Sequence, residues 1–167
     1  PYVGFLADDG LYLLMADILA PGTVADLPVY AHVRAHSQLP PLFPLALGLA
    51  GGGSADLPVA RVVVALTMLI AVIGYFIWLQ QQHVRAFAGG ALTLLFALMP
   101  ITIIHTVDLW SEGMYIALSL LALIALDAAR REQFRLLPCV VAGVLVGCAM
   151  TTRSVGVALL PAMFIMC

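Results

Sequence analysis

The feature that most constrains this chain is a succession of long apolar segments separated by short polar links. The run from Val62 to Leu79 has no charged side chain. At about 1.5 Å per residue, a helix of this length crosses the hydrocarbon core of a bilayer. The whole chain is 63% hydrophobic and 10% charged, with a mean hydropathy of +1.10. Ordinary soluble domains are more polar, so we expect an integral membrane protein.

Further apolar segments follow the first. A second span is predicted over Ala86–Ile104 and a third over Leu109–Leu126. Leu136–Met150 and Val155–Cys167 are shorter, and the polar residues 151–154 between them indicate two short or broken helices. Such breaks persist in a membrane only beside protein or water. The predicted fold is an all-α, polytopic transmembrane helical bundle.

The first part of the chain has a different pattern of apolar segments from the rest. Residues 1–58 are expected to form an extracytoplasmic loop, and 59–167 about five transmembrane or broken helices. Within the loop, Leu11–Leu19 and Leu42–Leu49 are apolar but too short to span, which is typical of interfacial, juxtamembrane helices. The chain begins without Met and ends inside an apolar run. We therefore expect a fragment of one membrane domain, with an N-terminal helix and a C-terminal part missing.

The arginines predict the orientation. All seven basic residues are arginine, and four of them lie in the links 80–85 and 127–135. The positive-inside rule places both links in the cytoplasm, and hence the first loop and residues 105–112 on the outer side. The chain has no basic tract of the kind that binds nucleic acid, so that class of partner is excluded.

Two adjacent carboxylates, Asp8 and Asp9, precede a helix-like stretch over residues 10–20. One interpretation is a helix N-cap, where Asp is favoured and the helix dipole stabilises negative charge. The other is catalytic. One carboxylate accepts a proton from an attacking hydroxyl while its neighbour orients a substrate or a metal ion.

A second acidic cluster lies in the loop at 105–112. Asp108 and Glu112 have an i, i+4 spacing that can place both on one helix face, and His105 lies close in sequence. Carboxylate oxygens and an imidazole can bind a divalent ion. The alternative is an ordinary interfacial loop with solvated acids and with Trp110 at the level of the lipid headgroups.

Arg153 is a charge between two apolar stretches. A charge at the centre of a membrane helix costs roughly 2.5 to 3.5 kcal/mol on insertion scales, and it usually faces a cavity or a partner. Phosphate is a natural partner for a guanidinium group. In the alternative, Arg153 lies at the outer end of a short helix and extends to the headgroups.

Four stretches of the chain carry a resemblance to a known family: DDGLYLLMADILAPG, PPLFPLALGLAGG, SEGMYIALSLLALIAL and GVLVGCAMTTRSVGVALLP. In this order they resemble the C-type superfamily of membrane glycosyltransferases, especially the bacterial branch related to protein O-mannosyltransferases and aminoarabinose transferases (glycosyltransferase family 39). Together they cover most of the chain.

The resemblance implies transfer of a sugar from a polyprenyl-phosphate donor to a hydroxyl of a glycan, lipid or protein acceptor, at the outer face of a bacterial plasma membrane. It implies that Asp8 is the general base and Asp9 its neighbour, although many relatives have Glu at the second position. Tyr12, Glu112 and Arg153 are expected to bind the substrate and its phosphate. A divalent ion near Glu112 is the one cofactor considered.

Two other classes of function fit the same sequence. In a transporter or flippase, membrane acids bind a coupling ion and the helix break at 151–154 lines a substrate path. In a noncatalytic scaffold, substitution of the carboxylates has no effect. Because most of the acids lie in predicted outer loops rather than mid-span, surface chemistry is favoured over conduction.

Overall fold

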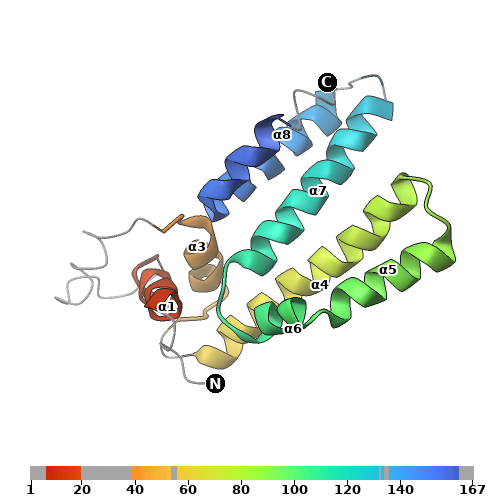
Figure 1. Ribbon diagram of the computed structural model, residues 1–167. Helices are drawn as coiled ribbons and strands as arrows, with labels where there is room; N and C mark the ends of the chain where they lie inside the picture. Colours follow the sequence, from red (N-terminus) through yellow and green to blue (C-terminus); the bar gives the residue numbers. More distant parts are fainter. Residues whose placement is uncertain (1–6, 20–38, 54–55, 132, 134–135, 162–167) are drawn as a thin grey trace.

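The computed structural model describes residues 7–19, 39–53, 56–131, 133 and 136–161, with side chains from residue 10 onward (Figure 1). Over these residues the secondary structure is entirely helical. The elements are α1 (Ala7–Leu19), α3 (Leu42–Leu49), α4 (Leu57–Gln81), α5 (Ala86–Leu98), α6 (Pro100–Val107), α7 (Glu112–Arg131), α8 (Leu136–Thr152) and the 3-10 helix η1 (Ser154–Ala158).

Two helices, α4 and α7, are long and apolar enough to cross a membrane. The sequence prediction of a helix over Val62–Leu79 is confirmed by α4, which has 25 residues. Its start is set by Asp56, whose side chain accepts a hydrogen bond from the Val59 amide at 3.4 Å, and by Pro58 in the first turn. Both residues are typical of helix N-termini.

The segment Ala86–Ile104, which was predicted to span the membrane, is not one continuous helix. The segment is divided into α5 and α6, which are bent by 58° at their junction. Met99 is extended there, with φ −59° and ψ 134°, and Pro100 begins α6. The proline ring disfavours a helical conformation in the preceding residue, which accounts for the break. The pair counts as a third crossing only if it forms one broken span; the alternative is a re-entrant loop.

Replacing Pro100 with Ala is expected to straighten this pair, because it removes the restriction on Met99. Spin labels at Phe87 and Val107, both exposed, would report the change in a background without native cysteines. At about 1.5 Å per residue, their backbone separation should grow from about 26 Å in the bent pair to about 30 Å in one helix. An unchanged distance by pulsed electron paramagnetic resonance would show that packing on α4, rather than the proline, holds the bend.

The boundaries of the third predicted helix also differ. α7 begins at Glu112, three residues after the predicted start, and continues to Arg131, so that Asp127 lies inside the helix rather than in a link. The Asp127 side chain is buried and pairs with Arg131 at 2.8 Å. Arg131 also donates to the backbone carbonyl of Gln81. These contacts join the C-terminal ends of α7 and α4, and they explain why the helix extends past the apolar run.

The long helices pack side by side through small residues (Figure 1). α4 and α7 run in the same direction, while α8 returns antiparallel to α7. A Cβ atom added at Gly113 of α7 would lie 3.2 Å from Thr67 Oγ1, and one at Gly74 of α4 would lie 3.5 Å from Leu120 Cβ. Small residues at such contacts are typical of helix pairs in membranes, where close packing replaces the hydrophobic effect.

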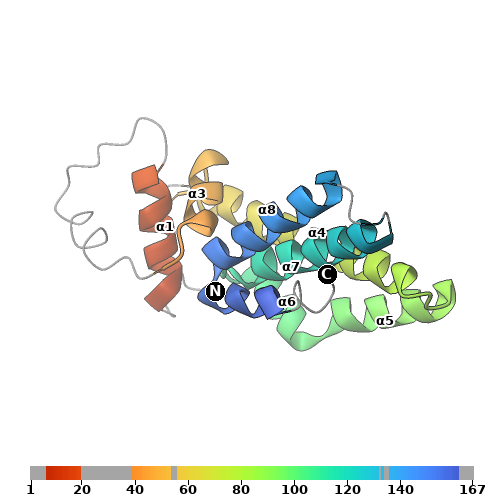
Figure 2. The same cartoon turned by 90° about the horizontal axis from the view of Figure 1, so that it is seen from above.

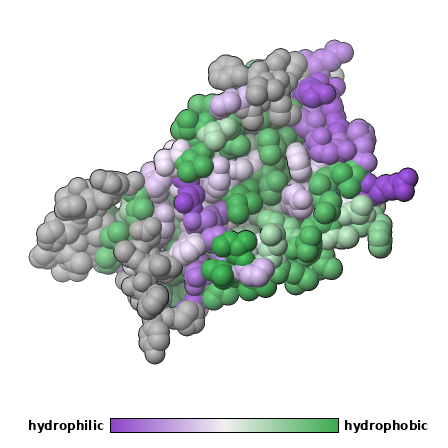
Figure 3. All heavy atoms as spheres, viewed as in Figure 1, coloured by the Kyte–Doolittle hydropathy of each residue, from purple (hydrophilic) through white to green (hydrophobic). Residues whose placement is uncertain are grey.

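The outer faces of these helices are apolar. Figure 3 shows hydrophobic side chains over the face made by α4, α5 and α6, and hydrophilic residues at the end of the molecule where α4 and α7 end. Large exposed side chains on this face include Leu66, Ile73, Leu94 and Ile101. A water-soluble protein rarely exposes so extensive an apolar surface, so this face is consistent with membrane association.

The two predicted short helices are both present. α3 has the predicted bounds, whereas α1 begins at Ala7 and therefore includes Asp8 and Asp9 in its first turn. Figure 2 shows α1 lying across the end of the long helices rather than along them. Its buried side chains, among them Leu13, pack with Leu47 of α3. α1 and α3 thus form a platform at one end of the bundle.

Candidate functional site

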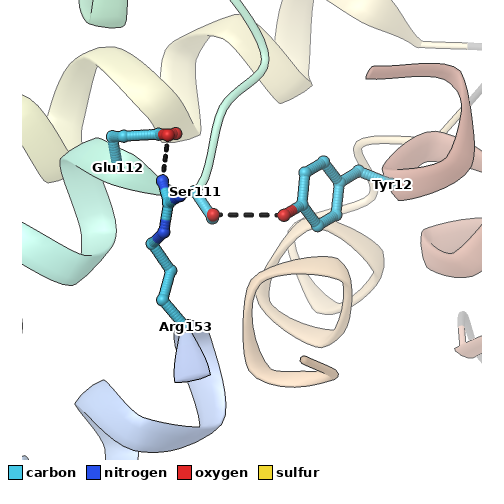
Figure 4. Close-up of polar contacts among 4 residues, drawn as sticks. All are labelled: Tyr12, Ser111, Glu112 and Arg153. Carbon is cyan, nitrogen blue, oxygen red and sulfur yellow. Dashed lines mark hydrogen bonds and ion pairs between the residues drawn. The ribbon is translucent and has the colours of Figure 1, made fainter. Parts of the chain in front are cut away.

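The polar residues of interest meet at the end of the bundle that carries this platform. Figure 4 shows Tyr12 from α1, Ser111 and Glu112 from the start of α7, and Arg153 from the break after α8. Two polar contacts connect these segments, which lie far apart in the sequence. We call this group of four residues the polar cluster.

Tyr12 is held by contacts at both ends of its side chain. Its ring packs edge-on against Phe43 of α3, with ring centroids 5.0 Å apart. Its hydroxyl lies 3.1 Å from Ser111 Oγ, and both side chains are buried. Since a buried hydroxyl needs a hydrogen-bond partner, this contact fixes α1 relative to the start of α7. Sequence reasoning missed Ser111 because nothing in its neighbourhood distinguishes it from other interfacial serines.

Replacing Tyr12 with Phe tests this contact. The ring packing on Phe43 is retained, but the buried Ser111 hydroxyl loses its partner, at a cost of about 1 kcal/mol or somewhat more in the free energy of unfolding. Ser111→Ala serves as the matched single variant, and unfolding in detergent followed by circular dichroism gives the double-mutant cycle. Additive effects of the two changes would show that the hydroxyls do not stabilise each other.

Glu112 and Arg153 form an ion pair between Arg153 Nη1 and Glu112 Oε1. The side chains are 24% and 35% exposed, respectively, so the pair is accessible from one side. Glu112 begins α7 and Arg153 follows the C-terminus of α8. Each charge therefore complements the dipole of its own helix.

A helix break at the polar residues 151–154 was predicted and is present, because α8 ends at Thr152; the reversal of the backbone after it was not predicted. Arg153 is extended, with φ −150° and ψ 138°, and η1 then packs back on the end of α8. Gly156 makes this possible. A Cβ atom at Gly156 would lie 2.7 Å from both N and Cα of Met150. The reversal directs the Arg153 side chain toward Glu112 (Figure 4), and sequence reasoning gave Gly156 no such role.

The structure describes the backbone of the predicted catalytic pair, Asp8 and Asp9. Asp8 and Asp9 lie in the first turn of α1, and Asp8 precedes Tyr12 by one helical turn. The prediction that they lie before the helix, as an N-cap does, is corrected by the start of α1 at Ala7. The side chains of both residues lie outside the described part of the structure. Their positions on the helix nevertheless put them at the same end of the bundle as the polar cluster.

The predicted metal ligands are not arranged as a site. α6 ends at Val107 and α7 begins at Glu112, so Asp108 and Glu112 do not share a helix face, and that expectation is wrong. His105 is buried, with its ring 4.9 Å from that of Trp110. Across the side chains that the structure describes, no three His, Cys, Asp or Glu residues are grouped to hold an ion. Three-point metal binding by these residues does not fit this geometry.

Comparisons with protein-family models, with curated proteins and with solved structures find no match to the chain. The chemical case is therefore made from the residues themselves. The cluster brings together a guanidinium group, a carboxylate and two hydroxyls at the edge of the apolar bundle. Only one of the five N–H donors of Arg153 is needed for the contact with Glu112, so the others can bind an oxyanion.

Proposed function

We propose that the chain is part of a membrane glycosyltransferase that transfers a sugar from a polyprenyl-phosphate donor to an acceptor hydroxyl. The observation that supports this proposal is the meeting of Tyr12, Glu112 and Arg153 in one cluster. They come from three of the four stretches that carry the family resemblance.

The proposed membrane arrangement is a polytopic bundle with the polar cluster on the outer side of a bacterial plasma membrane. In it α4, the bent pair α5–α6, α7 and α8 cross the bilayer, and α1 and α3 lie in the outer interface. Arg85 follows the C-terminal end of α4, and Arg130 and Arg131 lie in the last turn of α7, away from the cluster. The positive-inside rule assigns that end to the cytoplasm.

In the proposed reaction, the acceptor oxygen attacks the anomeric carbon and the bond from that carbon to the lipid phosphate breaks. The acceptor proton passes to the Asp8 carboxylate, and the lipid phosphate leaves with the bonding electron pair. Arg153 stabilises the negative charge that grows on the leaving phosphate. Glu112 holds the guanidinium in position until the phosphate arrives, while Tyr12 orders α1 against the cluster.

Broken helices often form substrate paths in transporters, and the bent pair α5–α6 adds a second such break to the one at 151–154. The side chains at the α5–α6 break are apolar, however, and Met99, Ile101 and Ile103 are exposed. A path for an ion or a polar solute needs polar groups at the break. The glycosyltransferase proposal therefore accounts better for the distribution of polar residues.

The proposal is tested by sugar transfer from a panel of radiolabelled polyprenyl-phosphate sugars, using membranes that contain the wild-type protein or Asp8→Asn. We expect the variant to lose activity by about 100-fold or more, since a positioned general base contributes factors of about 10² to 10⁴. Asp56→Asn is the matched control, because Asn caps α4 as well as Asp does. Full activity in Asp8→Asn removes Asp8 from this role, and no transfer from any donor favours the transporter or scaffold classes.

A further inference from the structure

A groove separate from the polar cluster lies between the beginning of α4 and the end of α6. Its volume is about 330 Å³, and it is lined by Arg61, Val62, Ala65, Thr106 and Val107. None of these residues belongs to the four in Figure 4. The groove lies between two of the helices, α4 and α6, whose exposed side chains are largely apolar.

The groove combines apolar walls with one cationic group. Val62, Ala65 and Val107 supply the walls, and the Thr106 hydroxyl already donates to the carbonyl of Thr102 at 2.8 Å. Arg61 makes neither a hydrogen bond nor an ion pair within the described part of the chain. The acids nearest to it in the two elements, Asp56 and Asp108, form no ion pair with it. Among the side chains that the structure describes, none supplies a counter-charge to this half-buried guanidinium.

The position of Arg61 along α4 indicates which group supplies the negative counter-charge. The charge-free stretch Val62–Leu79 begins at the next residue. As a helix this stretch is roughly 27 Å long, close to the thickness of about 30 Å of the hydrocarbon core. With α4 in a membrane, Arg61 is level with the lipid phosphates, and the walls of the groove extend below it among the acyl chains.

We propose that this groove binds one anionic phospholipid, with the phosphate against the Arg61 guanidinium and an acyl chain along Val62, Ala65 and Val107. A guanidinium group binds phosphate oxygens in a two-point contact that an isolated ammonium does not reproduce. The inference relies on the membrane insertion of α4 proposed above, but not on sugar transfer. A lipid bound in this groove contacts both α4 and α6, and so stabilises the packing of α6 on α4.

The test uses quenching of tryptophan fluorescence by brominated lipids. Trp110 follows the groove residue Val107 by three positions, and Trp78→Phe leaves it as the only tryptophan. The protein is reconstituted into vesicles of phosphatidylcholine and phosphatidylglycerol in which only one of the two lipids is brominated. We expect about fivefold preferential quenching by brominated phosphatidylglycerol, the ratio that one arginine at the headgroup level provides.

Arg61→Gln is expected to remove this preference, while Arg61→Lys retains part of it and Arg85→Gln, at the opposite end of α4, retains all of it. Equal quenching by the two lipids in the wild type, or an undiminished preference in Arg61→Gln, overturns the proposal. Relief of quenching by traces of undecaprenyl phosphate also overturns it, because the groove then belongs to a carrier lipid. Lipid preference is measured without sugar donors, so its failure is distinct from a failure of the glycosyltransferase proposal.

Discussion

Gly156→Ala is expected to abolish the proposed sugar transfer and to lower the free energy of unfolding by at least about 2 kcal/mol. A Cβ atom at this position would lie 2.7 Å from N and Cα of Met150. Because these are backbone atoms, no change of rotamer relieves the overlap, and overpacking of this kind typically costs about 1 to 3 kcal/mol. η1 must then move away from α8, and Arg153 at its start moves with it.

The matched control for this variant is Gly147→Ala, in the neighbouring helix α8. A Cβ atom at Gly147 would have nothing within 4 Å, and Ala is favoured over Gly inside a helix by about 0.5 to 1 kcal/mol. We expect this change to be neutral or slightly stabilising and to leave transfer unchanged. Unfolding in detergent and transfer in membranes are measured for both variants. Equal effects of the two substitutions would mean that the close approach of η1 to α8 is not needed.

The sequence predicted best those elements whose signal is local. α4 was predictable because a long charge-free run leaves few alternatives to a membrane-crossing helix. The helix break at 151–154 was predictable because two threonines, an arginine and a serine interrupt an apolar run, but the reversal of the chain after it was not. The bend between α5 and α6 was missed although Pro100 marks it, since a proline in a membrane helix often causes only a kink. The extension of α7 to Arg131 depends on contacts with α4, which no local pattern reveals.

Three residues of the polar cluster, Tyr12, Glu112 and Arg153, were predicted as candidate site residues, but Ser111 and the contacts within the cluster were not. Tyr12 and Ser111 are 99 positions apart, and Glu112 and Arg153 are 41 apart. Such pairs depend on how the helices pack, and residue type alone does not identify them. The i, i+4 spacing of Asp108 and Glu112 misled for the same reason, because a helix face exists only where one helix contains both residues. The structure instead pairs Glu112 with Arg153. From the sequence, both residues were assigned to substrate binding, but their contact with each other was not predicted.

The charge of Arg153 is expected to be the second large determinant of activity. Arg153→Gln removes the group that stabilises the leaving phosphate, and loss of such a group typically slows a reaction by factors of about 10² to 10³. Glu112→Gln is expected to be milder, because the guanidinium remains and only its orientation is loosened. Each single change also breaks the ion pair, and because the pair is partly exposed, we expect both variants to lose about 1 kcal/mol of stability or less.

Exchanging the two charges separates the structural role from the chemical one. In the double variant Glu112→Arg with Arg153→Glu, an ion pair between the same two positions is again available, so we expect stability to recover in the double-mutant cycle. Transfer should remain as low as in Arg153→Gln, because the cation now projects from the start of α7 and a carboxylate repels the phosphate from the break after α8. Recovery of transfer together with stability would show that the pair only holds the two helices together. Loss of transfer at restored stability would assign the phosphate contact to Arg153 itself.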